Sequence, residues 1–208
     1  MGEMLRHVFG WVCGQNPAHT WSPGGELLPL CQRCTGLYVG ALVAALLHLA
    51  ARPAPTPRWL WLNGAFLLFM MPSGFHWIPQ NPELRCASGI FFGFGLVAFL
   101  RLTLPDKFTI CDLRFTRPPA IQSGRVHSKS QIADSAAPPH VCGYRFFAAG
   151  LVAALVLTPG LAENGNAVAA GFLIFACVAG ALALAALVLA NLFFLLRWLA
   201  RKIATRTS

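Results

Sequence analysis

Long apolar stretches separated by short polar segments dominate the hydrophobic pattern of this chain. A bilayer core of about 30 Å requires about 20 helical residues to cross it, and five stretches approach or exceed that length. They lie at about 35–51, 59–77, 87–104, 144–162 and 167–199. The pattern therefore predicts an all-α, polytopic integral membrane protein with about five transmembrane helices.

Three of these stretches depart from a regular span. A Pro-Ser-Gly sequence at 72–74 interrupts the second and Arg101 lies inside the third, so either helix is expected to be tilted or broken. The last stretch is longer than a bilayer core at about 1.5 Å per residue, and we expect its span to end near Asn191. From there to Arg206, the sequence predicts either a basic helix on the membrane interface or a helix that projects into the cytoplasm.

Composition supports the membrane assignment. Hydrophobic residues make up 56% of the chain and charged residues 11%, and the mean hydropathy is +0.60. Soluble domains contain about 25% charged residues, so the chain differs strongly from that class. The first ten residues lack a continuous apolar region, which indicates that no cleavable signal peptide is present and that the first span directs insertion.

The distribution of basic residues predicts the orientation. With five spans, Arg6, Arg33 and Arg85 fall on one side, and all the other Lys and Arg residues of the total of 16 fall on the opposite side. The positive-inside rule then predicts an extracytoplasmic N-terminus and a cytoplasmic C-terminus in a plasma (inner) membrane. The net charge of +9 is explained by this topology and indicates no nucleic-acid partner.

This topology divides the chain into four expected parts. They are an extracytoplasmic cysteine-containing segment at 1–34, a three-span core at 35–104, a flexible basic cytoplasmic loop at 105–143, and two C-terminal spans with a basic tail at 144–208.

A pair of cysteines stands where the chain enters the first span. Cys31 and Cys34 are three positions apart at a predicted helix start, so their sulfurs point the same way and can share a metal ion or form a redox pair. Other thiol and imidazole groups are expected on the same side of the membrane, in the N-terminal segment and in the loop after the second span. They are Cys13, His19, His76 and Cys86.

Three interpretations of these groups stay open. The first is a tetrahedral metal site, for which zinc is the best match; its candidate ligands are Cys13, Cys31, Cys34, His19 and His76. The second is a structural disulfide with no bound metal, in which Cys86 is a disulfide partner or a fourth thiol. The third is thiol-disulfide exchange by Cys31 and Cys34, activated by Arg33 and the positive end of the helix.

Polar residues near the predicted site are candidates for binding a substrate or a lipid headgroup. They are Gln15, Arg33, Thr35, Tyr38, Gln80 and Arg85. Two of them, Arg33 and Arg85, would also offset the net negative charge of three thiolates around a divalent cation. Ordinary anchoring at the membrane interface is the alternative interpretation, particularly for Tyr38.

Two pairs of glycines predict which spans pack together. Gly36 with Gly40, and Gly89 with Gly93, have the spacing that lets helix backbones approach closely in a membrane. We therefore expect the first and third spans to be in contact, which would bring Arg85 and Cys86 toward the cysteine pair.

Two motifs resemble a known family. Residues 13–17 read CGQNP and residues 28–40 read LPLCQRCTGLYVG. They resemble the Cys-His-Gln-x-Pro and Leu-Pro-x-Cys-x-Arg-Cys-Thr-Gly-x-Tyr-x-Gly patterns of the uncharacterised prokaryotic membrane proteins grouped as domain of unknown function 2085. A third, weaker block extends the resemblance to about residues 11–100. It implies a membrane protein and brings no established activity with it.

The chain departs from the family pattern at two positions. Gly14 stands where the family has His after the first cysteine, and His76 stands where the family usually has Asp. One potential ligand is lost and another is gained. If the family site binds a metal, His76 or His19 is therefore the expected replacement for the missing imidazole.

Two classes of function remain. One is a membrane enzyme or redox protein with an outward-facing thiolate–metal centre that acts on a lipid or a small hydrophobic molecule. The other is a non-enzymatic membrane subunit or accessory protein with a disulfide-stapled head, or a thiol-disulfide exchanger. Membrane lipids and a further membrane protein are the expected partners, and no residue is assigned a catalytic role.

Overall fold

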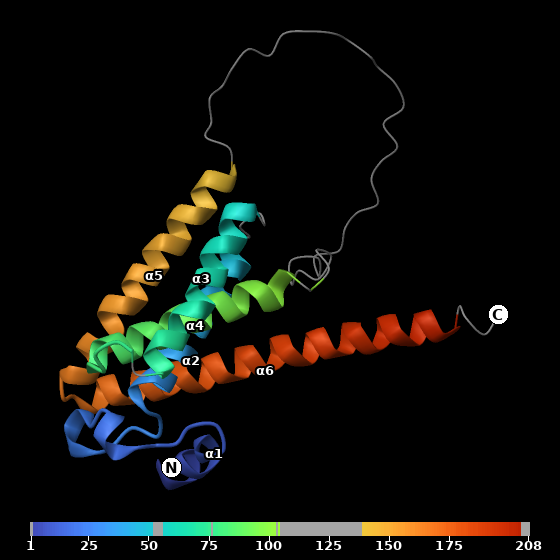
Figure 1. Ribbon diagram of the computed structural model, residues 1–208. Helices are drawn as coiled ribbons and strands as arrows, with labels where there is room; N and C mark the ends of the chain where they lie inside the picture. The colour runs from blue at the N-terminus through green and yellow to red at the C-terminus, as the bar shows by residue number, and fades with distance from the viewer. Residues whose placement is uncertain (1, 52–55, 76, 103, 105–138, 205–208) are drawn as a thin grey trace, which may run out of the picture.

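The computed structural model describes residues 2–51, 56–75, 77–102, 104 and 139–204 (Figure 1). These residues form helices and no strands, which confirms the all-α prediction. The elements are α1 (Gly2–Gly10), the short 3-10 helices η1 (Pro17–His19) and η2 (Pro23–Gly25), α2 (Gln32–Ala51), α3 (Pro57–Gly74), α4 (Pro82–Leu102), α5 (Pro139–Glu163) and α6 (Ala167–Ala204). Residues 105–138 of the predicted cytoplasmic loop, and His76, lie outside the described residues.

Helices α2 and α4 form the closest pair in the bundle and run in the same direction. A Cβ atom added to Gly36 would meet the carbonyl of Cys86, and one added to Gly40 would meet that of Ile90. Likewise, a Cβ atom on Gly89 would meet the carbonyl oxygen of Arg33. The backbone of each helix therefore occupies the space that a larger residue in place of the other helix's glycines would need. The predicted contact of the first and third spans is confirmed.

Helix α3 follows α2 in the sequence and brings the chain back along the bundle to the start of α4. It runs antiparallel to α4, because Ser73 near its C-terminal end donates a hydrogen bond of 3.2 Å to Ser88, whereas Phe66 packs against Phe91 farther along α4. Pro72 belongs to the sequence for which a tilted or broken helix was expected; it lies inside the last turn of α3, and the helix continues unbroken to Gly74.

Helices α5 and α6 pack against α2 in opposite directions. Gly150 of α5 lies against the Leu47 side chain near the end of α2, whereas Gly180 of α6 lies against the Tyr38 carbonyl near the start. The start of α6 is also near the start of α2, because the Cys177 thiol lies 3.9 Å from the carbonyl oxygen of Thr35. Helices α2, α4 and α6 are thus parallel, and α3 and α5 run the other way.

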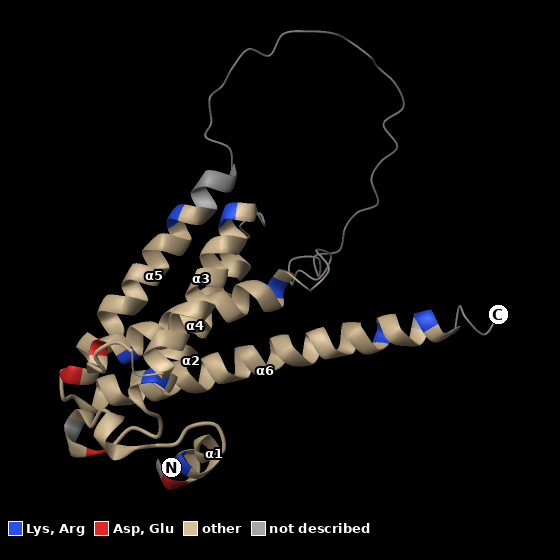
Figure 2. Ribbon diagram, viewed as in Figure 1, with Lys and Arg blue, Asp and Glu red and all other residues tan. Residues whose placement is uncertain are grey.

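We call the end of the bundle where α2 and α4 begin the cysteine end, because Cys31 and Cys34 lie there. Charges separate along the bundle (Figure 2). At the end of the bundle away from the cysteines, the described residues of α3, α4 and α5 carry only basic charges, at Arg58, Arg101 and Arg145. The cysteine end carries both the acidic residues of the described chain and the arginines at 6, 33 and 85.

Four helices contain segments long and apolar enough to cross a membrane. These segments are Gln32–Ala50, Pro82–Leu102, Tyr144–Glu163 and Ala167–Ala200. Helix α3 is not among them, but the parallel arrangement of α2 and α4 requires the chain to return along the bundle, and α3 does so. Large apolar side chains are exposed on outward faces, as expected for helices in contact with lipid; they include Val152, Val156, Phe172, Phe175 and Leu182.

One predicted boundary was wrong. Helix α4 begins at Pro82 rather than near residue 87, so Arg85 and Cys86 lie in its first two turns and not in a loop.

Helix α6 is continuous from Ala167 to Ala204, so the chain stays helical past Asn191, and the end of the membrane span near that residue stays a prediction. The side-chain amide of Asn191 donates hydrogen bonds to the carbonyl oxygens of Leu187 and Leu100, at 2.8 and 2.9 Å, and so ties α6 to the end of α4.

An apolar hollow of about 740 Å³ lies between α3 and α5, with α4 as its floor. Phe66, Phe94 and Phe147 line it, and at its rim the Thr56 and Tyr144 hydroxyls are 3.3 Å apart. This hollow is at the end of the bundle away from the cysteines, so it is separate from the site described below.

The contact between α2 and α4 can be tested with a matched pair of valine substitutions. Gly36→Val should lower the free energy of unfolding by about 1–3 kcal/mol or more, because the new side chain meets the backbone of α4. Gly64→Val in α3 is the control, since no atom lies within 4 Å of a Cβ atom there. Unfolding of the detergent-purified variants by increasing SDS would give the two values, and equal losses would contradict the proposed packing.

Candidate metal centre

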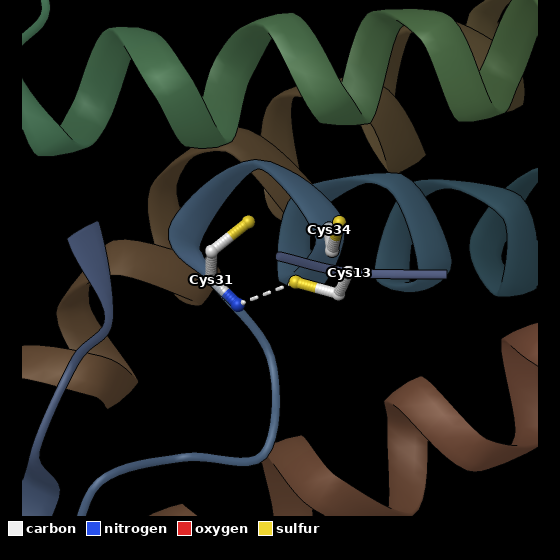
Figure 3. A group of neighbouring side chains, drawn as sticks. All are labelled: Cys13, Cys31 and Cys34. Atoms are coloured by element: carbon white, nitrogen blue, oxygen red, sulfur yellow. Dashed lines mark hydrogen bonds between the residues drawn. The ribbon is translucent and has the colours of Figure 1, made fainter. Parts of the chain in front are cut away.

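Three cysteine sulfurs meet at the cysteine end of the bundle. Cys31 precedes the first turn of α2, Cys34 lies in that turn, and Cys13 comes from the segment that follows α1. The three sulfur atoms all lie within 4.8 Å of one another. Figure 3 shows the Cys13 side chain directed toward the start of α2, near both other cysteines.

The N-terminal segment is held against α2 by its own backbone. The Cys31 N–H donates a hydrogen bond of 3.3 Å to the Cys13 sulfur, and the Cys13 N–H donates to the carbonyl oxygen of Phe9 at 2.9 Å. The side chain of Gln15 donates to the carbonyl oxygens of Arg6 and Pro29, at 2.6 and 3.0 Å. The two bonds of Gln15 join α1 to the segment that precedes α2, so Gln15 has a structural role here.

The Gln15 backbone has a positive φ of 43°, which is uncommon for residues other than glycine. Gln15 lies between Cys13 and η1. The hydrogen bonds of its side chain stabilise this conformation, because they join it to Arg6 in α1 and to Pro29 in the segment before α2.

The environment of Cys13 favours its thiolate. The side chain is 5% exposed, and burial alone would raise its pKa. Hydrogen bonds from the thiols of Cys31 and Cys34, and from the Cys31 backbone, outweigh burial and hold the pKa of Cys13 far below its usual value. A buried thiolate beside two further thiols is suited to binding a soft or borderline cation.

The triangle of sulfur atoms matches the size of a zinc site. With Zn–S bonds of about 2.3 Å, a tetrahedral site places its sulfurs about 3.8 Å apart. The observed upper limit of 4.8 Å would need to shorten by about 1 Å, which small side-chain rotations can provide. The three cysteines supply three of the four positions of such a site.

The other predicted ligands are placed differently. His19 is at the end of η1, and its ring is not part of the group of ligand atoms within 4.8 Å. His76 lies outside the described residues, so its role stays a prediction. Cys86 is fully buried on α4, with its carbonyl against Gly36, and it too is outside the triangle. All five cysteines whose side chains are described are free thiols.

The predicted binding residues separate into two groups. Arg33, Gln80 and Arg85 form one group between the starts of α2 and α4 and the end of α3. Thr35 and Tyr38 belong to the side of α2 that faces α6 and the N-terminal segment, where the rings of Tyr38 and Phe9 are 5.8 Å apart.

Arg33 connects three elements at this end of the bundle. Its Nη2 donates to the carbonyl oxygen and hydroxyl of Ser73, at 2.9 and 3.1 Å, and to Gln80 Oε1 at 3.3 Å. Gln80 also donates to the Ser73 carbonyl oxygen, at 3.0 Å. Carbonyls in the last turn of a helix lack partners within the helix, so these two side chains cap α3.

Two contributors to the site were not predicted from the sequence. Phe9 covers Tyr38 and accepts the Cys13 N–H at its carbonyl oxygen, and Ser73 receives the hydrogen bonds of Arg33. In the sequence, Ser73 is only part of the interruption at 72–74. Its contact with Arg33 depends on the tertiary packing of α2 against the end of α3, which no local pattern indicates. No sequence motif singled out Phe9.

Residues 13–99 match the model of the family described as "Predicted membrane protein (DUF2085)". The resemblance inferred from the motifs is confirmed. The DUF2085 segment contains all three cysteines of the triangle together with α2, α3 and nearly all of α4. These findings support a membrane protein.

One relative extends the comparison to the archaea. An uncharacterized protein of Methanothermobacter thermautotrophicus is 29% identical over 101 residues, which cover 45% of this chain and 88% of that protein. No solved structure matches the chain. The similarity therefore covers most of that archaeal relative but less than half of this chain.

The hydrogen bonds of Cys13 predict how many protons a metal displaces. If Cys13 is already a thiolate, zinc binding at pH 7 should release fewer protons than the three expected from three protonated thiols. Calorimetric titration of the apo-protein in buffers with different ionisation enthalpies would measure this number. Release of about three protons would show that Cys13 is protonated before the metal binds.

Proposed function

We propose that this chain is a plasma-membrane protein that holds a zinc ion at the extracytoplasmic end of its helical bundle. Cys13, Cys31 and Cys34 are the proposed ligands, and His19 or His76 is the proposed fourth ligand. The observation that carries this proposal is that sulfurs from two separate segments lie within 4.8 Å of one another. Three cysteines with one histidine form a known type of zinc site.

Zinc is favoured over other cations by the donor atoms. Thiolates select soft and borderline metals, and the group of three contains no carboxylate that would suit magnesium or calcium. Two of the cysteines stand at the start of a rigid transmembrane helix, and the third is fixed by backbone hydrogen bonds. Such an arrangement reduces the conformational entropy that metal binding must overcome.

The proposed centre lies at the boundary between the apolar bundle and the N-terminal segment. Cys31 and Cys34 are partly exposed, whereas Cys13 is buried. Molecules that reach the exposed sulfurs arrive from the membrane surface, so a lipid or a small hydrophobic molecule is the proposed class of substrate. The alternative form of this proposal is a non-enzymatic protein in which the zinc ion is a structural clamp that only holds the N-terminal segment to the start of α2.

Metal analysis tests the centre directly. Protein purified in detergent without chelators should contain about one zinc per chain, and a Cys13→Ser, Cys31→Ser, Cys34→Ser triple variant should contain almost none. Cys177→Ala is the matched control, because this buried thiol lies near the start of α2 but outside the triangle. Inductively coupled plasma mass spectrometry would give the ratios.

A metal-free wild-type protein would contradict the zinc proposal. Mass spectrometry of the same sample after blocking free thiols would then distinguish a stable disulfide from a reducible exchange pair. A disulfide that resists reduction in the folded protein would support the clamp, and ready reduction by dithiothreitol would support thiol-disulfide exchange.

Thiol labelling tests the proposed orientation. In intact cells, a membrane-impermeant maleimide should fail to label Cys111 and Cys142, and a permeant maleimide should label both after the membrane is crossed. Peptide mapping by mass spectrometry separates these two thiols from the other five. Labelling of Cys111 and Cys142 by the impermeant reagent would reverse the orientation and place the zinc site on the cytoplasmic side.

A further inference from the structure

Two arginines face each other across the tightest helix contact of the bundle without an acidic partner. Arg33 lies in the first turn of α2 and Arg85 in the first turn of α4, and these helices are parallel. Arg85 is only 8% exposed. Within the described part of the chain, neither guanidinium group forms a salt bridge with a carboxylate, although Glu83 is in the same turn as Arg85.

Toward the described residues, most donors of the two guanidinium groups are unused. Among these residues, Arg33 donates only through Nη2, and its buried Nε has no hydrogen-bond partner. Arg85 donates to the described chain only through Nε, to the carbonyl oxygen of Gln80 at 3.3 Å. Because each guanidinium carries five N–H bonds in a planar fork, both retain donors in the arrangement that binds oxyanions.

The two guanidinium groups together carry more positive charge than the cysteine triangle carries negative charge. Arg33 and Arg85 are close enough for their charges to repel, and the Cys31 sulfur is close enough to attract Arg85. Three thiolates around a divalent cation carry one net negative charge, which balances one arginine and leaves the other. The starts of α2 and α4 add further positive potential, because helix N-termini carry partial positive charge.

Capping of α3 accounts for part of the role of Arg33 but not for Arg85. The bonds from Arg33 to Ser73 satisfy the end of α3. A single bond from Arg85 to the Gln80 carbonyl oxygen would be satisfied equally by a neutral donor such as glutamine. A nearby negative group would stabilise the positive charge of this largely buried side chain.

We propose that Arg33 and Arg85 together bind a phosphate group at the cysteine end of the bundle. Guanidinium groups bind phosphate oxygens in pairs, and the position at the end of two membrane-spanning helices is where phospholipid phosphates lie. Free phosphate and a lipid headgroup share this chemistry. The inference requires no metal, so it stands or falls separately from the zinc proposal.

Thermal unfolding of the purified full-length protein provides the first test. Inorganic phosphate, compared with chloride at equal ionic strength, should raise the Tm by about 3–6 °C at a concentration of tenfold the Kd. In parallel, native mass spectrometry should show retention of phosphatidylglycerol over phosphatidylcholine. A response to phosphate alone indicates a soluble ligand, and retention of the anionic lipid alone indicates a headgroup site. Absence of both responses would overturn the proposal.

Substitution of Arg85 locates the binding. Arg85→Gln keeps a donor for the Gln80 carbonyl oxygen and should weaken phosphate or lipid binding about 10–100-fold. Arg85→Lys retains the charge and should restore part of the affinity, and it also serves if the glutamine variant fails to fold. Arg58→Gln, at the other end of the bundle, is the control and should bind like the wild type.

The same titrations separate the inference from the proposed metal centre. The effect of phosphate should persist in protein stripped of metal by a chelator, since the arginines bind it. An equal response in the wild type, Arg85→Gln and Arg85→Lys would show that the anion binds elsewhere and would overturn the proposal. The proposal would also be overturned if the phosphate response disappeared when the metal was removed and Arg85→Gln with bound metal kept the full affinity.

Discussion

The close parallel contact of α2 and α4 determines the arrangement of the rest of the bundle. Glycines at 36, 40, 89 and 93 allow backbone to pack on backbone, so neither helix can rotate without a steric collision. Because the two helices are parallel, the chain that joins them must run back along the bundle as α3, which packs against α4 and brings its C-terminal carbonyl at Ser73 beside Arg33. The same contact places the first turns of α2 and α4 side by side, and with them both arginines.

The cysteine triangle depends on a second, smaller packing unit. Phe9, Cys13, Leu30 and Val39 form an apolar cluster with Cys177 of α6, which holds the N-terminal segment over the start of α2. The sulfur of Cys13 therefore approaches the cysteine pair from the opposite direction to α4. A ligand between the arginines and a metal among the sulfurs would lie on different sides of the same helix turn, coupled through the rigid backbone of α2.

The sequence predicted the features that depend on local pattern. Apolar length identified the helices, glycine spacing identified the α2–α4 contact, and the spacing of Cys31 and Cys34 identified two members of the triangle. The start of α4 was missed because Glu83 and Arg85 read as loop residues by hydropathy, although Pro82 suits the first position of a helix. The role of Gln15 could not be foreseen, because it depends on a positive φ and on carbonyls distant in sequence. His19 and His76 stay predictions for the fourth ligand.

The length of α6 gives the molecule a mechanical asymmetry. The helix is fastened to α2 at Gly180 and to α4 at Asn191, and the side chains beyond Asn191 are largely exposed as far as Ile203. These last residues form a rigid arm of about 20 Å. A change of about 10° in the tilt of this arm would move its tip by about 3–4 Å, carrying Trp198 and Lys202 with it. Small adjustments where α6 meets the bundle would thus be amplified into displacements of a cationic, aromatic tip on the far side from the cysteines.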